Sequence, residues 1–183
     1  MGSVSTGRVT VRPSMPALPP PWIFTDIDGV LNNEALFGWF KAAGRPRPPH
    51  EWLDPVCLRH LEWLVRTARA RLVITSNWRR YLPGAGELGR ALARGGLESS
   101  PFGTTPLLAG ASGGDPPADL RAREVAAFLA GHPPAPYVIL EDVEGWCRHF
   151  PRGRYVRTEP SVGLTRDDVI RALGLLNDQR EAT

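Results

Sequence analysis

The chain has 183 residues, of which 42% are hydrophobic and 22% are charged, as in an ordinary globular protein with one sizeable core. No apolar run approaches the roughly 20 residues that a transmembrane helix needs, so the sequence predicts no membrane partner. The N-terminus lacks the charged, apolar and cleavage regions of a signal peptide, and we therefore expect a cytoplasmic protein. The two cysteines are too few for a disulfide framework, and their spacing fits no zinc site.

The basic side chains are nearly all arginines, because Lys41 is the only lysine in a chain of net charge +3. Arginine suits bidentate recognition of phosphate. The positive excess is small, however, and an arginine-rich genome would produce the same composition. Charge alone therefore leaves nucleic-acid binding open.

Composition divides the chain into a tail and one folded region. Residues 1–20 are dominated by Ser, Thr, Gly and Pro and have the composition of a disordered tail. Residues 21–178 are expected to form a single domain. Within it, residues 32–52 form a small insertion with a short apolar helix and a proline-rich stretch, and residues 109–118 form a flexible loop rich in Gly, Ala and Pro.

Strands and helices alternate along the folded region. Apolar runs predict strands over residues 22–26, 71–74, 137–140 and 155–158, with a shorter strand between residues 101 and 108. Helical spacing and N-cap residues predict helices that begin at Asp54 and Pro55, near residue 86, at residue 119, and at Thr165. This alternation predicts an α/β fold, with a doubly wound parallel sheet covered on both faces.

The first apolar run ends in the tetrad Asp26-Ile27-Asp28-Gly29. Strand alternation places the two carboxylates on the same side, roughly 6–7 Å apart. Such a pair can hold a divalent cation, or one carboxylate can attack an electrophile while the other moves a proton. Gly29 allows a sharp turn and a close approach of backbone to a ligand. A calcium-binding EF-hand is not expected, because no bidentate glutamate closes the loop.

Two further apolar strands also end in polar side chains. The clusters are Thr75, Ser76 and Asn77 after the second strand, and Glu141 and Asp142 after the strand at residues 137–140. The carboxyl ends of parallel strands meet at one edge of a sheet, so these groups should gather around Asp26 and Asp28. Carboxylates for a metal and donors for anionic oxygens together suit phosphoryl transfer.

A positive side chain near the nucleophile is expected from the helix at residues 119–129. Arg121 precedes Val125 by four residues and therefore shares its inward face. Arg123 points about 160° away from Val125, given the helical step of about 100° per residue. We therefore choose Arg121, with Arg123 as the alternative.

The ordered set of motifs resembles the haloacid dehalogenase-like (HAD) phosphatase superfamily over about residues 22–176. A small-cap branch that includes the HAD domain of Swiss Army Knife RNA repair proteins is more similar still. The segments that carry this likeness are Ile74-Thr75-Ser76-Asn77-Trp78-Arg79, Arg121-Ala122-Arg123-Glu124-Val125, Val138-Ile139-Leu140-Glu141-Asp142 and Gly163-Leu164-Thr165. The resemblance implies a Rossmann-like sheet, bound Mg²⁺ and phosphatase chemistry.

The resemblance also implies a role for individual residues. Asp26 would be the nucleophile that forms an aspartyl-phosphate, and Asp28 would protonate the leaving group and then activate water. Ser76 would hold a phosphate oxygen, with Thr75 as the alternative, and Arg121 would stand where lysine is more usual.

Asp142 would bind Mg²⁺ together with Asp26 and the backbone carbonyl of Asp28. Thr75, Asn77 and Gly29 would contact the substrate. Glu141 departs from the more common Asp-Asp pair and is either a metal ligand or a group behind the ligands.

The sequence thus predicts a Mg²⁺-dependent phosphomonoester hydrolase. A small cap leaves the site open, which favours phosphates of nucleotides or nucleic-acid ends over deeply enclosed substrates. Trp78, beside Ser76, is either a platform for a substrate base or a wall of the sheet edge. The alternative function is a binding or regulatory module on the same scaffold with weak or no catalysis. The intact Asp26 and Asp28 pair argues against it.

Overall fold

The computed structural model describes residues 19–44, 48–82, 85–108 and 118–182. The predicted tail at residues 1–20 and the predicted loop at residues 109–118 lie almost wholly outside these ranges. Within the described residues, no helix combines the length and the apolar character needed to cross a membrane.

Five parallel strands form one sheet in the order β3-β2-β1-β4-β5. The strands are β1 (Trp22–Thr25), β2 (Arg71–Ile74), β3 (Gly103–Thr104), β4 (Tyr137–Glu141) and β5 (Tyr155–Arg157). Ile23 of β1 pairs with Leu72 of β2 on one side and with Val138 of β4 on the other. The chain therefore winds outward from β1 in both directions, which confirms the predicted doubly wound, Rossmann-like α/β fold.

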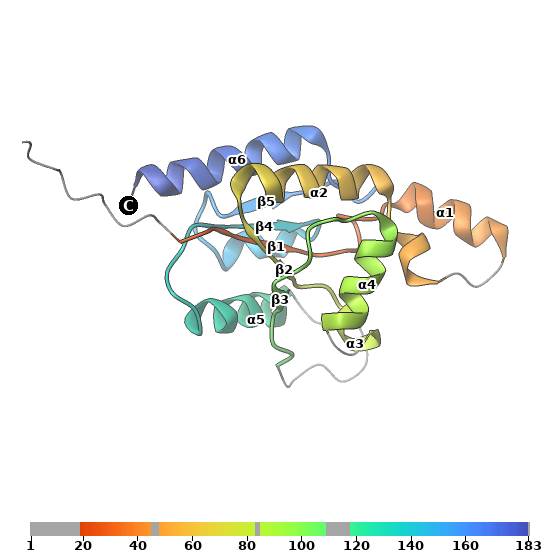
Figure 1. Ribbon diagram of the computed structural model, residues 1–183, viewed down its shortest axis with the longest axis horizontal. Helices are drawn as coiled ribbons and strands as arrows, with labels where there is room; N and C mark the ends of the chain where they lie inside the picture. The colour runs from red at the N-terminus through yellow and green to blue at the C-terminus, as the bar shows by residue number, and fades with distance from the viewer. Residues whose placement is uncertain (1–18, 45–47, 83–84, 109–117, 183) are drawn as a thin grey trace, which may run out of the picture.

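Helices cover both faces of the sheet (Figure 1). They are α1 (Glu34–Ala43), α2 (Pro55–Ala68), α3 (Trp78–Tyr81), α4 (Ala85–Gly95), α5 (Ala118–Ala130) and α6 (Arg166–Glu181), with 3₁₀ helices η1 (Pro49–Trp52) and η2 (Glu144–Arg148). Figure 1 shows α2 and α6 on one face and α5 on the other.

Side-chain alternation along the strands divides the core into two layers. Ile23, Leu72 and Val138 are buried in the larger layer, together with side chains of α2, α4 and α6. Phe24, Val73 and Ile139 point to the opposite face, where they meet Val125 and Phe128 of α5. The strands read as unbroken apolar runs because both of their faces are covered.

Local capping explains where the main helices start. Asp54 accepts a hydrogen bond from the Val56 amide at 2.7 Å and is followed by Pro55, as the sequence predicts for α2. Thr165 and Asp168 form the predicted reciprocal capping box at the start of α6.

The segment interpreted as a cap insertion contains two short helical elements. Asn33 caps α1 by accepting a hydrogen bond from the Leu36 amide at 2.9 Å. Its side-chain amide also donates to Asp54 at 2.7 Å, which ties the start of α1 to the start of α2. Trp52 of η1 packs against Phe37 and Phe40 of α1, with ring centroids 5.3 and 5.1 Å apart.

Two glycines provide a matched test of backbone strain. Gly163 has a φ of +75°, and an added Cβ would lie 2.7 Å from Cys57 Sγ and 3.0 Å from the Val30 carbonyl oxygen. Gly174 lies in α6, with nothing within 4 Å of an added Cβ. We expect Gly163→Ala to lower the free energy of unfolding by more than about 1 kcal/mol.

The control substitution, Gly174→Ala, should raise the free energy of unfolding by about 0.5–1 kcal/mol, because alanine is the better helix former. Urea unfolding followed by circular dichroism measures both changes. Equal effects of the two substitutions would contradict the strained geometry at Gly163.

Candidate active site

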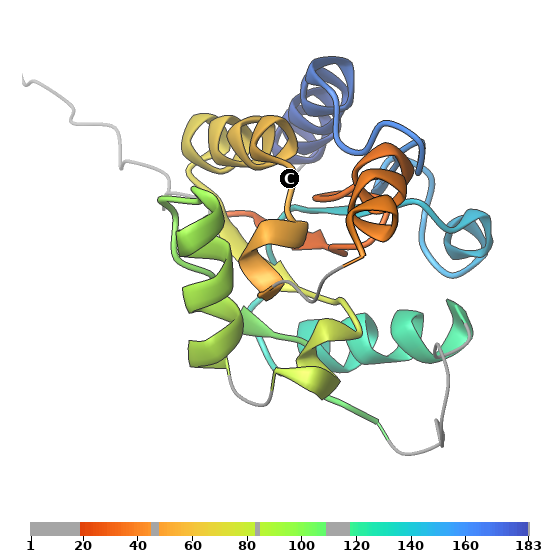
Figure 2. The same cartoon turned by 90° about the vertical axis from the view of Figure 1, so that its right-hand side faces the viewer.

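The candidate site lies where the direction of winding reverses, at the carboxyl ends of β1 and β4. Asp26 follows the last residue of β1, Glu141 is the last residue of β4, and Asp142 comes next. Ligands of open α/β sheets bind at such switch points. Figure 2 faces this edge of the sheet, with α1 and α5 on opposite sides of the strand ends.

Asp26 is held on both of its carboxylate oxygens. Oδ1 accepts a hydrogen bond from the Ile27 amide at 2.7 Å, and Oδ2 forms an ion pair with Arg121. The side chain of Asp26 is only 3% exposed. Its orientation is therefore fixed, which suits a group that must approach a substrate from one direction.

Arg121 reaches the sheet edge from α5. Its Nη1 donates to Asp26 and also to Glu141 Oε2, the latter at 3.1 Å. Burial alone would lower the pKa of Arg121, but the charges of Asp26 and Glu141 raise it overall, so the guanidinium stays protonated. Arg123 is exposed, so the structure brings the first of the two candidate arginines to the site and leaves the other in solvent.

Three carboxyl groups gather tightly enough to surround one cation. Oxygen atoms of Asp26, Glu141 and Asp142 all lie within 4.8 Å of one another. Gly29 lies against this cluster, because a Cβ at that position would overlap the Asp142 carboxylate. Three hard oxygen ligands in a partly buried cluster fit Mg²⁺, which prefers carboxylate oxygens and water.

Glu141 is the most deeply buried member of this cluster, with no exposed surface. Burial, reinforced by the charge of Asp26, raises its pKa well above the usual value. Its Oε1 atom has no hydrogen-bond partner among the described residues. A cation beside this atom would offset the cost of burying the carboxylate charge and would also give Oε1 a partner. The cluster therefore fits a metal.

Asp28 lies at the same edge but in a different environment. It accepts a hydrogen bond from the Asn32 side-chain amide at 2.8 Å, and Trp78 Nε1 donates to both of its oxygens at 3.1 Å. Burial raises the pKa of Asp28, and the charge of Asp26 adds to this effect against the hydrogen bonds. A carboxyl group with a raised pKa is more readily protonated, as a general acid requires.

The sheet register distinguishes the two candidate hydroxyl groups. The Thr75 amide donates to the Thr25 carbonyl, and the Asp26 amide donates to the Leu140 carbonyl, so Thr75, Asp26 and Glu141 are level with one another. Residues level in a parallel sheet point to the same face. The Thr75 hydroxyl is also buried without a hydrogen-bond partner in the described chain.

The Ser76 hydroxyl instead accepts a hydrogen bond from the Trp78 amide at 3.3 Å. Asn77 is buried at the start of α3. Of the three polar residues after β2, Thr75 therefore has the register of Asp26 and a free hydroxyl, whereas Ser76 supports the turn into α3.

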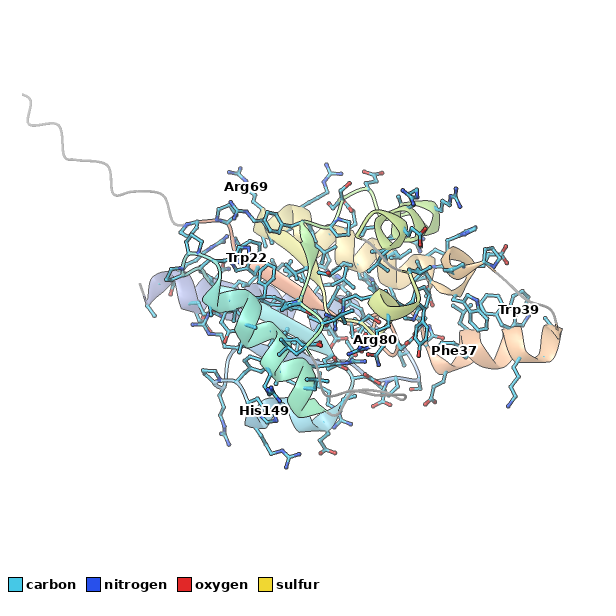
Figure 3. All side chains as sticks on the ribbon, turned by 90° about the horizontal axis from the view of Figure 1, so that it is seen from below. Trp22, Phe37, Trp39, Arg69, Arg80 and His149 are labelled. Atoms are coloured by element: carbon cyan, nitrogen blue, oxygen red, sulfur yellow. The ribbon has the colours of Figure 1, made fainter. Side chains whose placement is uncertain are left out.

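A buried arginine, which sequence reasoning missed, stabilises this part of the site. Arg79 donates to the carbonyl oxygens of Thr75, Ser76 and Thr105, each at 2.7 Å. It also pairs with Glu124 of α5 at 2.7 Å, and both side chains are at most 3% exposed. Arg80, labelled in Figure 3, lies 3.7 Å from the other oxygen of Glu124.

Glu124 could have been recognised from the periodicity of α5. It falls on the stripe formed by Arg121, Val125 and Phe128, at the spacing of one helix face. The same helix therefore places Arg121 against Asp26 and Glu124 against the turn after β2.

Residues near the C-terminus fix the backbone of the Asp-x-Asp-Gly turn. The Thr158 hydroxyl donates to the Gly29 carbonyl at 2.9 Å, and the Leu164 amide donates to the Val30 carbonyl at 2.8 Å. Gly29 has a φ of +71°, a conformation that side chains disfavour. The Gly163-Leu164-Thr165 segment singled out in the sequence thus contacts the turn itself.

This sheet order, with the Asp-x-Asp-Gly turn after β1, an arginine from α5 and acids after β4, defines a HAD-like domain. The family described as the HAD domain in Swiss Army Knife RNA repair proteins matches residues 22–169. The chain belongs to that family, which confirms the resemblance seen in the sequence and indicates a hydrolase of the phosphatase type. No curated protein and no solved structure matched the chain.

The Arg79–Glu124 pair generates a stability prediction. Arg79→Met removes the donor to Oε2 of the buried Glu124 and to several carbonyls, and we expect the free energy of unfolding to fall by about 3–5 kcal/mol. The matched control is Arg66→Met, because the Arg66–Glu98 pair spans 3.5 Å between side chains that are 69% and 78% exposed.

The control should cost less than about 1 kcal/mol, since surface ion pairs contribute little. Chemical unfolding monitored by tryptophan fluorescence compares the two variants. A loss at Arg79 no larger than the loss at Arg66 would show that the buried network contributes little.

Proposed function

We propose that this protein is a Mg²⁺-dependent phosphomonoester hydrolase that acts through an aspartyl-phosphate on Asp26. The observation that carries the proposal is the contrast between two neighbouring carboxyl groups. Asp26 is buried and paired with Arg121, whereas Asp28 is half-buried, has a raised pKa and borders an open pocket. Two carboxyl groups in such different surroundings suit a nucleophile and a general acid.

In the first half of the reaction, an oxygen of Asp26 attacks phosphorus and the bond to the leaving oxygen breaks. Asp28 gives its proton to that oxygen, so the substrate departs as an alcohol. The contacts of Asn32 and Trp78 hold Asp28 in place for this transfer. Arg121 offsets negative charge between the carboxylate and the incoming phosphate.

In the second half, Asp28 takes a proton from water, and the water oxygen attacks phosphorus. The bond to Asp26 breaks, inorganic phosphate leaves, and both carboxyl groups return to their starting states. The hydroxyl of Thr75 is proposed to hold a phosphate oxygen, supported by its register with Asp26 and its unused donor. Asn77 and the backbone at Gly29 are proposed to line the same region.

Asp26 and Asp142 are proposed to hold Mg²⁺ with the backbone carbonyl of Asp28, and Glu141 lies close enough to contribute or to support Asp142. When bound, the ion neutralises phosphate charge and positions the phosphate for in-line attack. Because Gly29 has no side chain, the Asp142 carboxylate can lie directly against it.

Phosphates at nucleic-acid ends or on nucleotides are proposed as the substrates. The support is the description of the family as a domain of RNA repair proteins. The competing function is a binding module on the HAD scaffold that turns over no phosphate ester.

Purified protein should hydrolyse p-nitrophenyl phosphate with Mg²⁺, lose this activity in EDTA, and regain it when Mg²⁺ is restored. Asp26→Asn should lower kcat by at least about 10³-fold, because the nucleophile is removed while the shape is kept. Turnover that is equal in Asp26→Asn and the unmodified protein would reject the aspartyl-phosphate mechanism.

The metal site can be tested through Gly29. Gly29→Ala places a methyl group against Asp142 and should weaken Mg²⁺ binding by about 10–100-fold, as displacement of groups around metal ligands typically does. Gly38→Ala is the control, since nothing lies within 4 Å of a Cβ there. Calorimetric Mg²⁺ titration, with thermal unfolding as a check on folding, measures the change. Unaltered affinity in Gly29→Ala would remove Asp142 from the site.

A further inference from the structure

An open pocket of about 510 Å³ adjoins Asp28, and its lining includes no member of the acidic cluster of Asp26, Glu141 and Asp142 among the described residues. Its walls come from separate parts of the chain, namely α1, η1 and the turn through α3. The lining consists of Asp28, Phe37, Pro49, Trp52, Trp78, Tyr81 and Leu82. The volume lies within the range of about 300–1,000 Å³ that small-molecule sites occupy.

Aromatic rings dominate this lining. Phe37 and Trp52 form one part of the wall, with their ring centroids 5.3 Å apart. Trp78 and Tyr81 form another part. Tyr81 is 75% exposed and Phe37 is 37% exposed, so apolar ring surface is open to a ligand. In Figure 3 Phe37 lies on the part of α1 nearer the rest of the protein, and Trp39 lies farther out.

Asp28 connects the pocket to the proposed chemistry. Trp78 lines the pocket with its ring and donates from Nε1 to both oxygens of Asp28. The group proposed to protonate the leaving oxygen therefore forms part of the pocket lining. The leaving group of the substrate must lie beside Asp28, and the pocket provides space for it there.

The lining also limits what that leaving part can be. Among the described residues that line it, Asp28 is the only charged one, so these residues offer no positive partner to a second phosphate or a charged peptide. Exposed aromatic rings instead favour a flat, uncharged ring that can stack on them. The volume also exceeds what one ring alone would fill, and it leaves room for a sugar between the ring and the phosphate.

Resting on the proposed phosphatase function, we propose that this pocket binds the base of the nucleotide whose phosphate is removed. Phe37, Trp52, Trp78 and Tyr81 supply the stacking surfaces. Stacking tolerates any base, and Trp78 Nε1 is already used by Asp28. The pocket should therefore recognise that a base is present and discriminate little among bases.

The test compares phosphorylated dinucleotides that differ only at the terminal residue. One set carries a base there and the other carries an abasic sugar, each with either a 5′- or a 3′-terminal phosphate. For the better of the two ends, we expect kcat/KM to be about tenfold higher with the base than without it. Adenine and uracil at that position should differ by less than about threefold.

Tyr81→Ala examines the pocket directly, and because Tyr81 is 75% exposed we expect the substitution to cost little stability. The ratio of base-containing to abasic kcat/KM should fall from about ten to near one. Trp63→Ala is the matched control, because Trp63 is also an exposed aromatic residue and lines a separate hollow. In Trp63→Ala, the ratio of base-containing to abasic kcat/KM should equal that of the unmodified protein.

A ratio near one in the unmodified protein, or a ratio that Tyr81→Ala leaves unchanged, would overturn the proposal. Faster turnover of a tyrosine-phosphorylated peptide than of either dinucleotide would assign the pocket to a phenol ring instead. Activity toward p-nitrophenyl phosphate separates the two proposals, because it requires Asp26 whether or not a base is recognised.

Binding to inactive protein covers the case in which no phosphate ester is hydrolysed. Adenosine monophosphate should quench the tryptophan fluorescence of Asp26→Asn protein, with Trp52 and Trp78 in the pocket wall. Adding Tyr81→Ala should weaken this binding by about tenfold, and adding Trp63→Ala should not. Absence of quenching, or equal weakening by both substitutions, would reject base binding independently of catalysis.

Discussion

The arrangement of the site depends on Arg121, whose guanidinium lies between the carboxylates of Asp26 and Glu141. Three carboxyl groups with oxygens within 4.8 Å of one another would repel strongly in a poorly solvated place. One protonated arginine offsets part of that repulsion and joins α5 to β1 and β4. Because Glu124 on the same helix pairs with Arg79, α5 also fixes the turn after β2. A single helix thus aligns the polar ends of three strands.

The same edge of the sheet offers Asp26 and Asp28 two different surroundings. Asp26 pairs with Arg121 and belongs to the acidic cluster, so it lies among charged groups. Asp28 accepts hydrogen bonds from Trp78 and borders a pocket lined mostly by aromatic rings. In the proposed reaction, Asp26 would therefore lie on the phosphate side of the substrate and Asp28 on its leaving-group side. Such an arrangement would suit in-line transfer, in which attack and protonation of the leaving oxygen occur on opposite sides of phosphorus.

Much of this arrangement could be predicted from the sequence, for identifiable reasons. β1, β2 and β4 are buried on both faces and so appear as apolar runs, and the inward stripe of α5 selects Arg121 over Arg123. The sequence could not distinguish Thr75 from Ser76 as the residue level with Asp26. That distinction depends on the register of the sheet, which is set by pairing between distant strands. α3 was not predicted, because a four-residue helix has no period. Arg79 was part of a recognised motif, but its role was not predicted, because its acceptors are mostly backbone carbonyls that every residue carries.

The contact between Thr158 and Gly29 joins residues separated by 129 positions in the sequence. β1 is synthesised first among the strands, yet its two neighbours and the segment that fixes its turn all follow it. During translation, the Asp-x-Asp-Gly turn therefore stays without its supports until residues 158–164 have left the ribosome. A chain that stops short of them would carry both aspartates and still lack the geometry that directs them. The site is thus complete only once Thr158, 129 positions beyond Gly29, has been synthesised.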